Sequence, residues 1–374
     1  MSQAMTSEER INTVISLKEP DRVPVALYMD AFAAHHAGIT LAEWVSDYEK
    51  GESAVEKTFA DLGGCDAMIR TGCPHPDSYA MGAAIRTKLP GRDLPADALW
   101  QYEEAPVMTV EDYDVIIEQG LAAFWQGYWP RIGIDPANVP SIARAVSDNS
   151  RSGILRWQTR GVQIFRGGMA VLPFDMFSFA RSINEFIFDL YRRPEKVLEA
   201  TEACLPDMVE MAVRAAKSTG AHRVFLGATR AAPTYISPKQ FEKFFLPSLR
   251  WTVERLIADG IMPFLHFDND WTPFLHYFKE LPGSKCILHL DGFTDIFKAK
   301  EILGSHMCLM GDVPPALLSI GTAEDVTEYC RRLIDQVGSG GGFILAHGCT
   351  VPADAKFENV RAIIEAAEKF GRYH

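Results

Sequence analysis

The sequence lacks the features that mark several large classes of protein. It has no cluster of lysine and arginine, and its 37 basic residues are outnumbered by 49 acidic ones, for a net charge of −12. A nucleic-acid or anionic-membrane partner is therefore not expected, because such binding depends on grouped cations. No apolar run approaches the roughly 18 residues of a membrane span, and the opening MSQAMTSEERINTV has no apolar signal core. We expect a cytoplasmic protein.

Cysteine is sparse and scattered, with seven residues in a chain of 374. A disulfide framework is not expected, since the number of cysteines is odd and a chain of this length builds a hydrophobic core without disulfide bonds. There is no internal repeat, and glycine and proline follow no period, which excludes collagen-like and low-complexity architectures. Hydrophobic residues make up 47% and charged residues 23%, so the composition is that of a folded protein.

Short apolar runs recur along the chain, each four to six residues long and continuous rather than alternating. Such runs are typical of strands buried on both faces. The eight runs are 23–28, 66–69, 169–172, 223–227, 261–266, 286–289, 307–310 and 343–346. Segments of helical apolar spacing lie between them, as over 360–370. This alternation predicts an α/β fold of the TIM (β/α)8 barrel type, with a doubly wound open sheet as the alternative.

The predicted barrel accounts for about 250 residues, so part of the chain is additional. The segment 70–168 is rich in proline, glycine and tryptophan and lies after the second predicted strand. We interpret it as an insertion within a single domain that covers 1–374, because no linker separates two units. Whether this insertion is a lid, a docking surface or both is left open.

Polar residues follow the last four predicted strands, where the reactive groups of parallel α/β folds lie. They are His266 and Asp268, then His289 and Asp291, then Asp312, and finally Cys349. Alternate residues of an extended segment point the same way, so His266 and Asp268 are able to converge on one point. With Cys349 they offer nitrogen, oxygen and sulfur ligands and leave one position open, as in a catalytic zinc site.

Each of these residues also has a plainer interpretation. A histidine at a strand end is often a hydrogen-bonding residue of the structure. Asp268 and Asp270 suit the cap of a helix that starts near Trp271. Buried cysteines are usually inert packing, but Cys349 differs because it lies in HGCTVP, a loop bounded by glycine and proline.

Four segments carry a resemblance to a known family. They are YISPKQFEKFFLPSLR, FLHFDND, MGDVPPALLSIGTAEDV and LAHGCTVPADAKFENVRAIIEAA. In this order they resemble the uroporphyrinogen decarboxylase superfamily and, within it, the methylcobamide:coenzyme M methyltransferase branch. The resemblance is strongest from about 165 to 371. It implies a TIM barrel and, in the methyltransferase branch, a zinc ion that is held by a His-x-Cys pair and a distant cysteine and that activates a thiol acceptor.

Carried over by position, the histidine falls on His266 and the distant cysteine on Cys349. The middle ligand falls on Asp268, where the branch has cysteine. A carboxylate is a competent zinc ligand that donates less charge and leaves the metal a stronger Lewis acid. The decarboxylase proper is a poorer match, because its Arg-Gln-Ala-Gly-Arg stretch corresponds here to YMDAFAAHHAG, which has no arginine for a tetrapyrrole's carboxylates.

Further residues are expected around the same mouth. Those predicted to bind substrate are Met29, Asp30, Asp175, Met176, Arg230, Tyr235 and His289. Arg230 suits a carboxylate or sulfonate of the acceptor, or an acidic neighbour in the protein. Asp291 and Asp312 are the catalytic candidates. His289 and Asp291 either orient His266 or supply a fourth ligand.

The residues and the resemblance together predict a zinc-dependent methyltransferase. It moves a methyl group between a corrinoid, carried by a small partner protein, and a small thiol or methylated substrate, in a direction that the sequence leaves open. The alternative is a metal-free decarboxylase or lyase that acts on a carboxylate or tetrapyrrole and uses Asp30 or Asp175 with Arg230. A third interpretation is a non-catalytic corrinoid-binding protein. The oligomeric state is not predicted.

Overall fold

A parallel β-sheet lies at the centre of the computed structural model, which describes residues 4–373. Its nine segments pair in the order β5-β2-β1-β11-β10-β9-β8-β7-β6. They are β1 (Val25–Leu27), β2 (Ala67–Met68), β5 (Gln163–Ile164), β6 (Gly168–Val171), β7 (Arg223–Ala228), β8 (Met262–Phe267), β9 (Ile287–Leu290), β10 (Cys308–Val313) and β11 (Phe343–His347). All the pairings within this sheet are parallel.

The two end segments of the sheet, β5 and β6, are separated by only three residues of the chain. The first pairs with β2 and the second with β7, and Gly167 N–H donates to the carbonyl of Arg223 at 3.0 Å. The segments β5 and β6 are thus two halves of one strand, which pairs with β2 in its first half and with β7 in its second. This change of partner joins the two ends of the sheet and closes the barrel. The nine segments therefore form the eight strands of a TIM-type barrel. The predicted fold class is confirmed, and each of the eight predicted runs overlaps a barrel strand.

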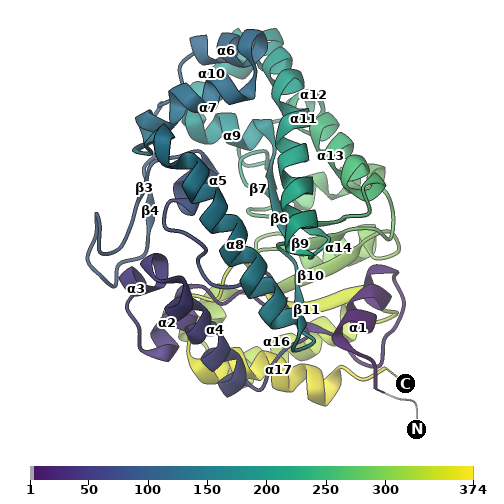
Figure 1. Ribbon diagram of the computed structural model, residues 1–374. Helices are drawn as coiled ribbons and strands as arrows, with labels where there is room; N and C mark the ends of the chain where they lie inside the picture. The colour runs from purple at the N-terminus through teal and green to yellow at the C-terminus, as the bar shows by residue number, and fades with distance from the viewer. Residues whose placement is uncertain (1–3, 374) are drawn as a thin grey trace.

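Helices follow the strands and cover the outside of the sheet (Figure 1). They are α2 (Ala31–Ala37), α3 (Leu41–Ser46), α4 (Tyr48–Leu62), α9 (Pro173–Ala180), α10 (Ile183–Arg192), α11 (Pro194–Thr219), α12 (Pro238–Phe244), α13 (Leu246–Ala258), the 3-10 helix η3 (Thr272–Glu280), α14 (Ile296–Leu303), α15 (Pro315–Ile320), α16 (Ala323–Gln336) and α17 (Phe357–Phe370). Local chemistry fixes their ends. At α16, for example, the side chain of Thr322 caps the helix and Asp325 completes a capping box.

A long segment connects β2 to β5 and lies beside the barrel (Figure 1). Its elements are α5 (Ser78–Ala83), the antiparallel pair β3 (Thr87–Lys88) and β4 (Gln101–Tyr102), α6 (Glu111–Gln119), α7 (Leu121–Tyr128), the 3-10 helices η1 (Trp129–Ile132) and η2 (Pro136–Asn138), and α8 (Val139–Gln158). The additional segment ends earlier than the expected boundary at 168, because β5 already belongs to the barrel sheet.

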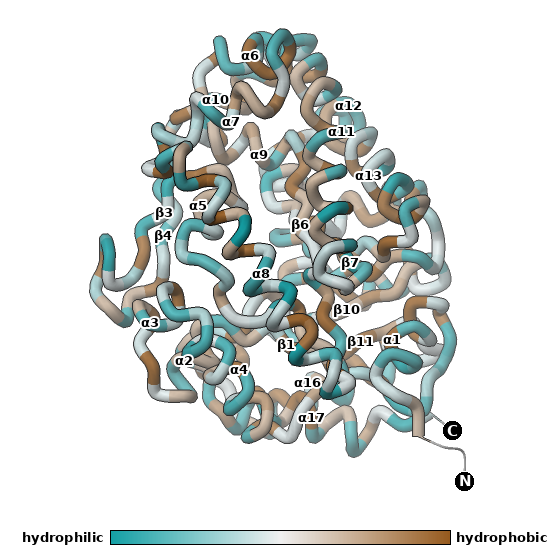
Figure 2. The backbone as a smooth tube through the Cα atoms, viewed as in Figure 1, coloured by the Kyte–Doolittle hydropathy of each residue, from teal (hydrophilic) through white to brown (hydrophobic). Residues whose placement is uncertain are grey.

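Apolar side chains fill both sides of the barrel wall. An inner cluster includes Phe165, Phe264, Ile287 and Met310, and helix α1 (Ser7–Ile15) closes it from below with Ile11. A larger cluster lies between the strands and the outer helices. Figure 2 shows hydrophobic colour along β10 and a mixture of hydrophilic and hydrophobic residues along α8. Within residues 4–373, no helix combines the length and apolarity needed to cross a bilayer.

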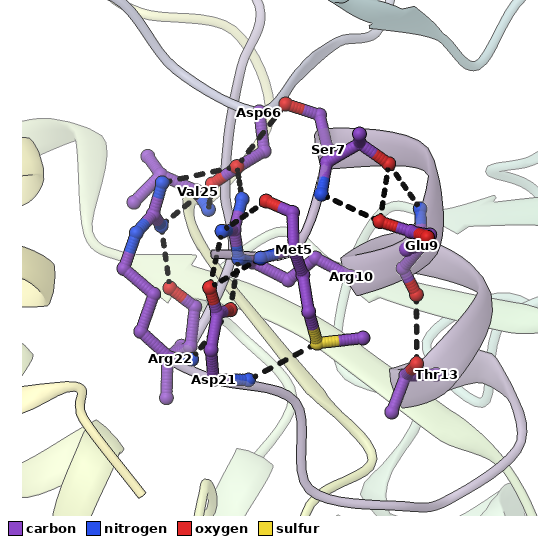
Figure 3. Close-up of polar contacts among 11 residues, drawn as sticks. Met5, Ser7, Glu9, Arg10, Thr13, Asp21, Arg22, Val25 and Asp66 are labelled. Carbon is purple, nitrogen blue, oxygen red and sulfur yellow. Dashed lines mark hydrogen bonds and ion pairs between the residues drawn. The ribbon is translucent and has the colours of Figure 1, made fainter. Parts of the chain in front are cut away.

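A buried carboxylate anchors the end of the barrel that α1 closes (Figure 3). Asp66, directly before β2, is 2% exposed. Its oxygens accept hydrogen bonds from Arg10 at 2.5 Å, from Arg22 at 2.7 and 3.0 Å, and from the backbone N–H of Val25 at 2.9 Å. The hydroxyl of Ser7 donates at 3.3 Å. This one side chain therefore joins α1, the segment before β1 and the start of β2.

Candidate metal centre

The inner row of β8 changes from apolar to polar toward the carboxyl end of the strand. Met262 and Phe264 pack with the barrel interior, and alternation places His266 and Asp268 on the same side further along. Beside this row, His266 pairs in register with His289 of β9. The histidines lie above the apolar filling of the barrel, where active sites of this fold are found.

Three predicted ligands come together at this end of the barrel. One donor atom each from His266, Asp268 and Cys349 lies within 4.8 Å of the other two, and Nε2 of His266 is 3.2 Å from Oδ1 of Asp268. Zinc bonds of about 2.0–2.3 Å require ligand atoms roughly 3.5 Å apart. The hydroxyl of Thr229 donates to Oδ2 of Asp268 at 3.0 Å and leaves Oδ1 facing the histidine. The donor set and its spacing fit a divalent zinc ion.

A chain of hydrogen bonds fixes the orientation of His266. Nε2 of His289 lies 3.0 Å from the carbonyl oxygen of His347, and Nδ1 of His289 lies 2.8 Å from Nδ1 of His266. A carbonyl only accepts, so His289 Nε2 carries a hydrogen. Burial and then the charge of His266 lower the pKa of His289 well below its usual range, so this ring is neutral. Its Nδ1 therefore accepts, and His266 Nδ1 donates.

This assignment leaves Nε2 of His266 directed at the other two ligands. Burial by itself lowers the pKa of His266. The carboxylate of Asp268 and then Cys349 raise the pKa by more than burial lowers it, so that the net pKa is about 10. Nε2 of His266, the carboxylate of Asp268 and the sulfur of Cys349 thus surround one point, where a positive charge is stabilised. In the absence of metal a proton supplies it, and a metal ion that displaces the proton satisfies the same three groups.

The loop that carries Cys349 approaches β9 closely because residue 348 is glycine. A Cβ at Gly348 would collide with the backbone carbonyl of Asp291. The backbone N–H of Gly348 donates to the carbonyl of Val313 at 2.9 Å and ties the loop to β10. On the other side, Nε2 of His347 accepts from the N–H of Tyr28 at 2.8 Å. The loop is therefore held by strands on both sides of β11.

Two predicted carboxylates lie beside the triad. Asp291 accepts from the backbone N–H of Asn269 at 2.7 Å and of Phe293 at 3.0 Å, and burial raises its pKa. Asp175 accepts from the N–H groups of Thr229 and Arg230. Its Oδ2 is buried without a hydrogen-bond partner, and burial raises its pKa to about 6. Asp291 therefore holds the loop after β8, which carries Asp268. Asp175 holds the loop after β7, which carries Thr229, the hydrogen-bond donor to Asp268.

The structure separates other predicted residues from the triad. Arg230 donates to the carboxylate of Glu104 at 2.5 and 3.1 Å, which realises the alternative of an acidic neighbour. Asp312 accepts from the hydroxyl of Tyr329 on α16 at 3.0 Å, so its hydrogen bond is to an outer helix. Burial and then the charges of two other aspartates raise the pKa of Asp312 to about 7.

The remaining predicted residues occupy three different settings. Met29 and Met176 are buried in the core between strands and helices. Tyr235 is exposed in the loop after β7. Asp30 is buried after β1, with Oδ1 3.2 Å from Nε of Arg70. Among these residues, only Asp30 belongs to a charged cluster near the mouth.

Two arginines of that cluster were missed by the sequence analysis. Arg70 follows β2, and Arg166 lies beside it between β5 and β6, where the third strand changes partner. The available signal was the position of Arg70 directly after the predicted strand 66–69. Arg166 was assigned to the insertion because the third strand was predicted to begin at Met169, after the point where the observed strand changes partner.

Comparison with known proteins supports the resemblance seen in the sequence. The profile of the uroporphyrinogen decarboxylase (URO-D) family matches residues 160–370. The chain belongs to this family. Uroporphyrinogen decarboxylases from Coxiella burnetii and Methylococcus capsulatus are each 26% identical to it, over 133 and 186 residues. These matches cover 35% and 48% of the chain and 36% and 51% of the two enzymes, so the chain spans only a third to a half of the curated relatives' length.

A solved structure matches this URO-D family member over nearly its whole length. A methyltransferase from Methanosarcina mazei superposes with a TM-score of 0.72, covering 98% of the chain and 99% of that protein at 16% sequence identity. At this identity the comparison demonstrates a shared fold. It shows that the barrel and the segment between β2 and β5 together form an architecture found in another protein.

Replacing His289 by phenylalanine is expected to weaken zinc binding by about 10- to 100-fold, the usual effect of losing the group that orients a histidine ligand. The aromatic ring fills the same buried space but offers no acceptor to Nδ1 of His266. A competition titration with a chromophoric chelator measures this affinity. His289→Gln restores an acceptor and is expected to recover part of it. Equal zinc affinity in the wild type and His289→Phe would rule out the orienting role.

Proposed function

We propose that this URO-D family member is a zinc-dependent methyltransferase. It moves a methyl group between a corrinoid, carried by a partner protein, and a small thiol or methylated molecule. The methyltransferase assignment draws on the structural neighbour from Methanosarcina mazei and on the resemblance of the HFD and HGC segments to the zinc-binding branch of the family.

The convergence of His266, Asp268 and Cys349 is the observation that carries this proposal. His266 lies in β8, Asp268 lies directly after it, and Cys349 comes from the loop after β11, 81 positions beyond Asp268. Nitrogen, oxygen and sulfur donors with one open position suit a catalytic zinc site rather than a structural one, which is closed by four protein ligands. An ion held by these three residues would leave one position for a substrate thiol.

The chain's own residues supply the binding and orientation. His266 offers Nε2 because its Nδ1 donates to His289, and Thr229 holds one oxygen of Asp268 so that the other faces the site. When bound, Zn²⁺ supplies Lewis acidity, which holds a thiol as the nucleophilic thiolate near neutral pH. An aspartate in place of a second cysteine leaves that Lewis acidity stronger. The site is therefore suited to deprotonating a weakly acidic acceptor or to polarising a methylated oxygen donor.

A decarboxylase or lyase activity is the second candidate, favoured by the names of the curated relatives. The segment after β1 contains no arginine, Arg230 is paired with Glu104, and Arg70 is paired with Asp30, so that of these arginines near the mouth Arg166 alone has no carboxylate partner among the described residues. A tetrapyrrole with several carboxylates requires several free cations at the mouth. We therefore rank this activity below methyl transfer.

Metal analysis combined with a methyl-transfer assay tests the proposal. The purified protein is expected to contain about one zinc per chain, with a single sulfur neighbour at about 2.3 Å in X-ray absorption spectra. It is expected to transfer methyl from methylcobalamin to a small thiol, or to demethylate the corresponding thioether onto reduced cobalamin. His266→Ala is expected to lose both zinc and transfer, because only the oxygen and sulfur ligands remain.

His306→Ala is the matched control for this variant. His306 is half-buried, and its Nε2 contacts the carbonyl of Leu281 at 2.8 Å on the outside of the barrel. Its loss is expected to leave zinc content unchanged. A full zinc complement in His266→Ala, or a wild-type protein that binds no zinc and moves no methyl group, would refute the proposed function.

A further inference from the structure

Two arginines lie on paired neighbouring segments of the sheet near the mouth of the barrel. Arg70 follows β2 and Arg166 follows β5, and the backbone N–H of Arg166 donates to the carbonyl of Ile69 at 2.9 Å. The charge of Arg70 is one of the influences that lower the pKa of Arg166, after burial itself. The fold thus places two like charges together where neither is fully solvated, and it needs anions to balance them.

The protein itself supplies an anion to only one of the two. Arg70 has Asp30, with Nε 3.2 Å from Oδ1, and the hydroxyl of Tyr79 lies 3.4 Å from Nη2. Within residues 4–373, no carboxylate lies within 4.0 Å of the Arg166 guanidinium. Its neighbours are Sδ of Met169, 2.9 Å from Nη2, and the ring of Phe225, 5.5 Å from Cζ.

These neighbours satisfy Arg166 poorly. A guanidinium carries five N–H donors, whereas a thioether sulfur is a weak acceptor. The aromatic face beneath it contributes a cation–π interaction, which is weaker than the cost of desolvating an unpaired ion. The group is therefore held in place by packing while most of its hydrogen-bonding capacity stays unused, as expected of an anion site that is formed in advance.

Arg166 is also close to the candidate metal centre. The ring of Phe225 beneath it is 5.2 Å from the ring of His266, so one aromatic side chain separates the guanidinium from the metal ligand. The phenol of Tyr28 lies in the same electrostatic environment, because Asp30, Arg70, Arg166 and Cys349 all act on its pKa, which burial raises. The ring of Phe225 thus packs against both the cation and one residue of the triad.

We propose that Arg166, supported by Arg70, binds an acid group of the substrate while the reacting heteroatom reaches the His266, Asp268 and Cys349 triad. The substrate class is a small organic acid with its thiol or methylated heteroatom a few bonds from the carboxylate. This inference rests on the proposed function for the reaction, but the anion site stands on its own contacts. It moves the acid-binding role from Arg230, which Glu104 neutralises, to Arg166.

A matched pair of probes tests this assignment. 3-Mercaptopropionate and 3-mercaptopropionamide have the same length and thiol and differ in charge, and their affinities are measured by calorimetry. We expect the wild type to bind the acid about 10- to 100-fold more tightly, the range for a hydrogen bond to a charged group. In Arg166→Met this preference is expected to fall to about threefold or less, because the remaining cation is already paired.

Arg223→Met is the control, since it removes a guanidinium at the start of β7 that already donates to the side chain of Gln163. It is expected to keep the full preference for the acid. If Arg166→Met does not fold, Arg166→Lys is used instead, because it keeps the positive charge but lacks the planar guanidinium. It is expected to bind the acid several-fold more weakly than the wild type does. Equal binding of acid and amide by the wild type, or an unchanged preference in the folded Arg166 variant, overturns the proposal.

The same samples separate this inference from the proposed function. Methyl transfer from methylcobalamin to each thiol is followed in parallel with binding. An acid preference that depends on Arg166, without zinc or methyl transfer, supports the anion site and refutes the methyltransferase. Zinc-dependent methyl transfer without any preference for the acid supports the methyltransferase and refutes the anion site.

Discussion

Replacing Cys349 by alanine is expected to empty the metal centre and to reduce methyl transfer by at least about 1,000-fold. Cys349 is the only sulfur in the triad. In the proposed zinc site, its loss would remove the thiolate donor and leave one nitrogen and one oxygen for the ion. The effect must exceed the roughly 10- to 100-fold that follows from losing a group behind a ligand. Zinc content after dialysis and the single-turnover rate with methylcobalamin measure the two consequences.

Cys330→Ala is the appropriate comparison. Cys330 is fully buried on α16, packs in the outer core and belongs to no ligand cluster among the described residues. Its substitution is expected to affect stability modestly, as for other small core truncations, while zinc content is preserved. Retention of zinc by Cys349→Ala at the wild-type affinity would show that the ion, if present, has other ligands.

Much of the fold followed from the apolar runs because strands covered on both faces leave a continuous signal. Each predicted run overlaps a barrel strand, including the weak run at 66–69, of which β2 retains two residues. The third strand was less accessible. Its first half at 163–164 pairs with β2 and its second half at 168–171 with β7. That change of partner depends on closure of the barrel, which no local pattern records.

The candidate triad was predictable because parallel strands end at a common edge. His266 and Asp268 have the two-residue spacing of one strand face, and Cys349 follows the last strand in a loop that glycine allows to approach. The partners of Arg230 and Asp312 were not predictable in this way. Arg230 meets Glu104 from the segment between β2 and β5, and Asp312 meets Tyr329 from an outer helix. Such pairings depend on how segments distant in sequence pack.

The second large effect concerns stability at the opposite end of the barrel, where Asp66→Ala is expected to lower the free energy of unfolding by about 3 kcal/mol. The substitution leaves the guanidinium of Arg10, only 7% exposed, without one of its two carboxylates. It also leaves the backbone N–H of Val25 without its acceptor. Because Arg10 keeps its pair with Asp21 at 2.6 Å, we expect the lower end of the range for breaking a buried ion pair.

Thermal unfolding of the purified variant measures this effect. For a chain of this length, a loss of about 3 kcal/mol corresponds to a fall in Tm of roughly 4 °C. Asp61→Ala makes the same chemical change at the exposed pair with Lys57 and is expected to stay within about 0.5 kcal/mol of the wild type. A Tm of Asp66→Ala equal to that of Asp61→Ala would mean that the cluster around Asp66 is neutral for stability. In that case, the apolar residues of α1, such as Ile11, would close this end of the barrel without help from the ion pairs.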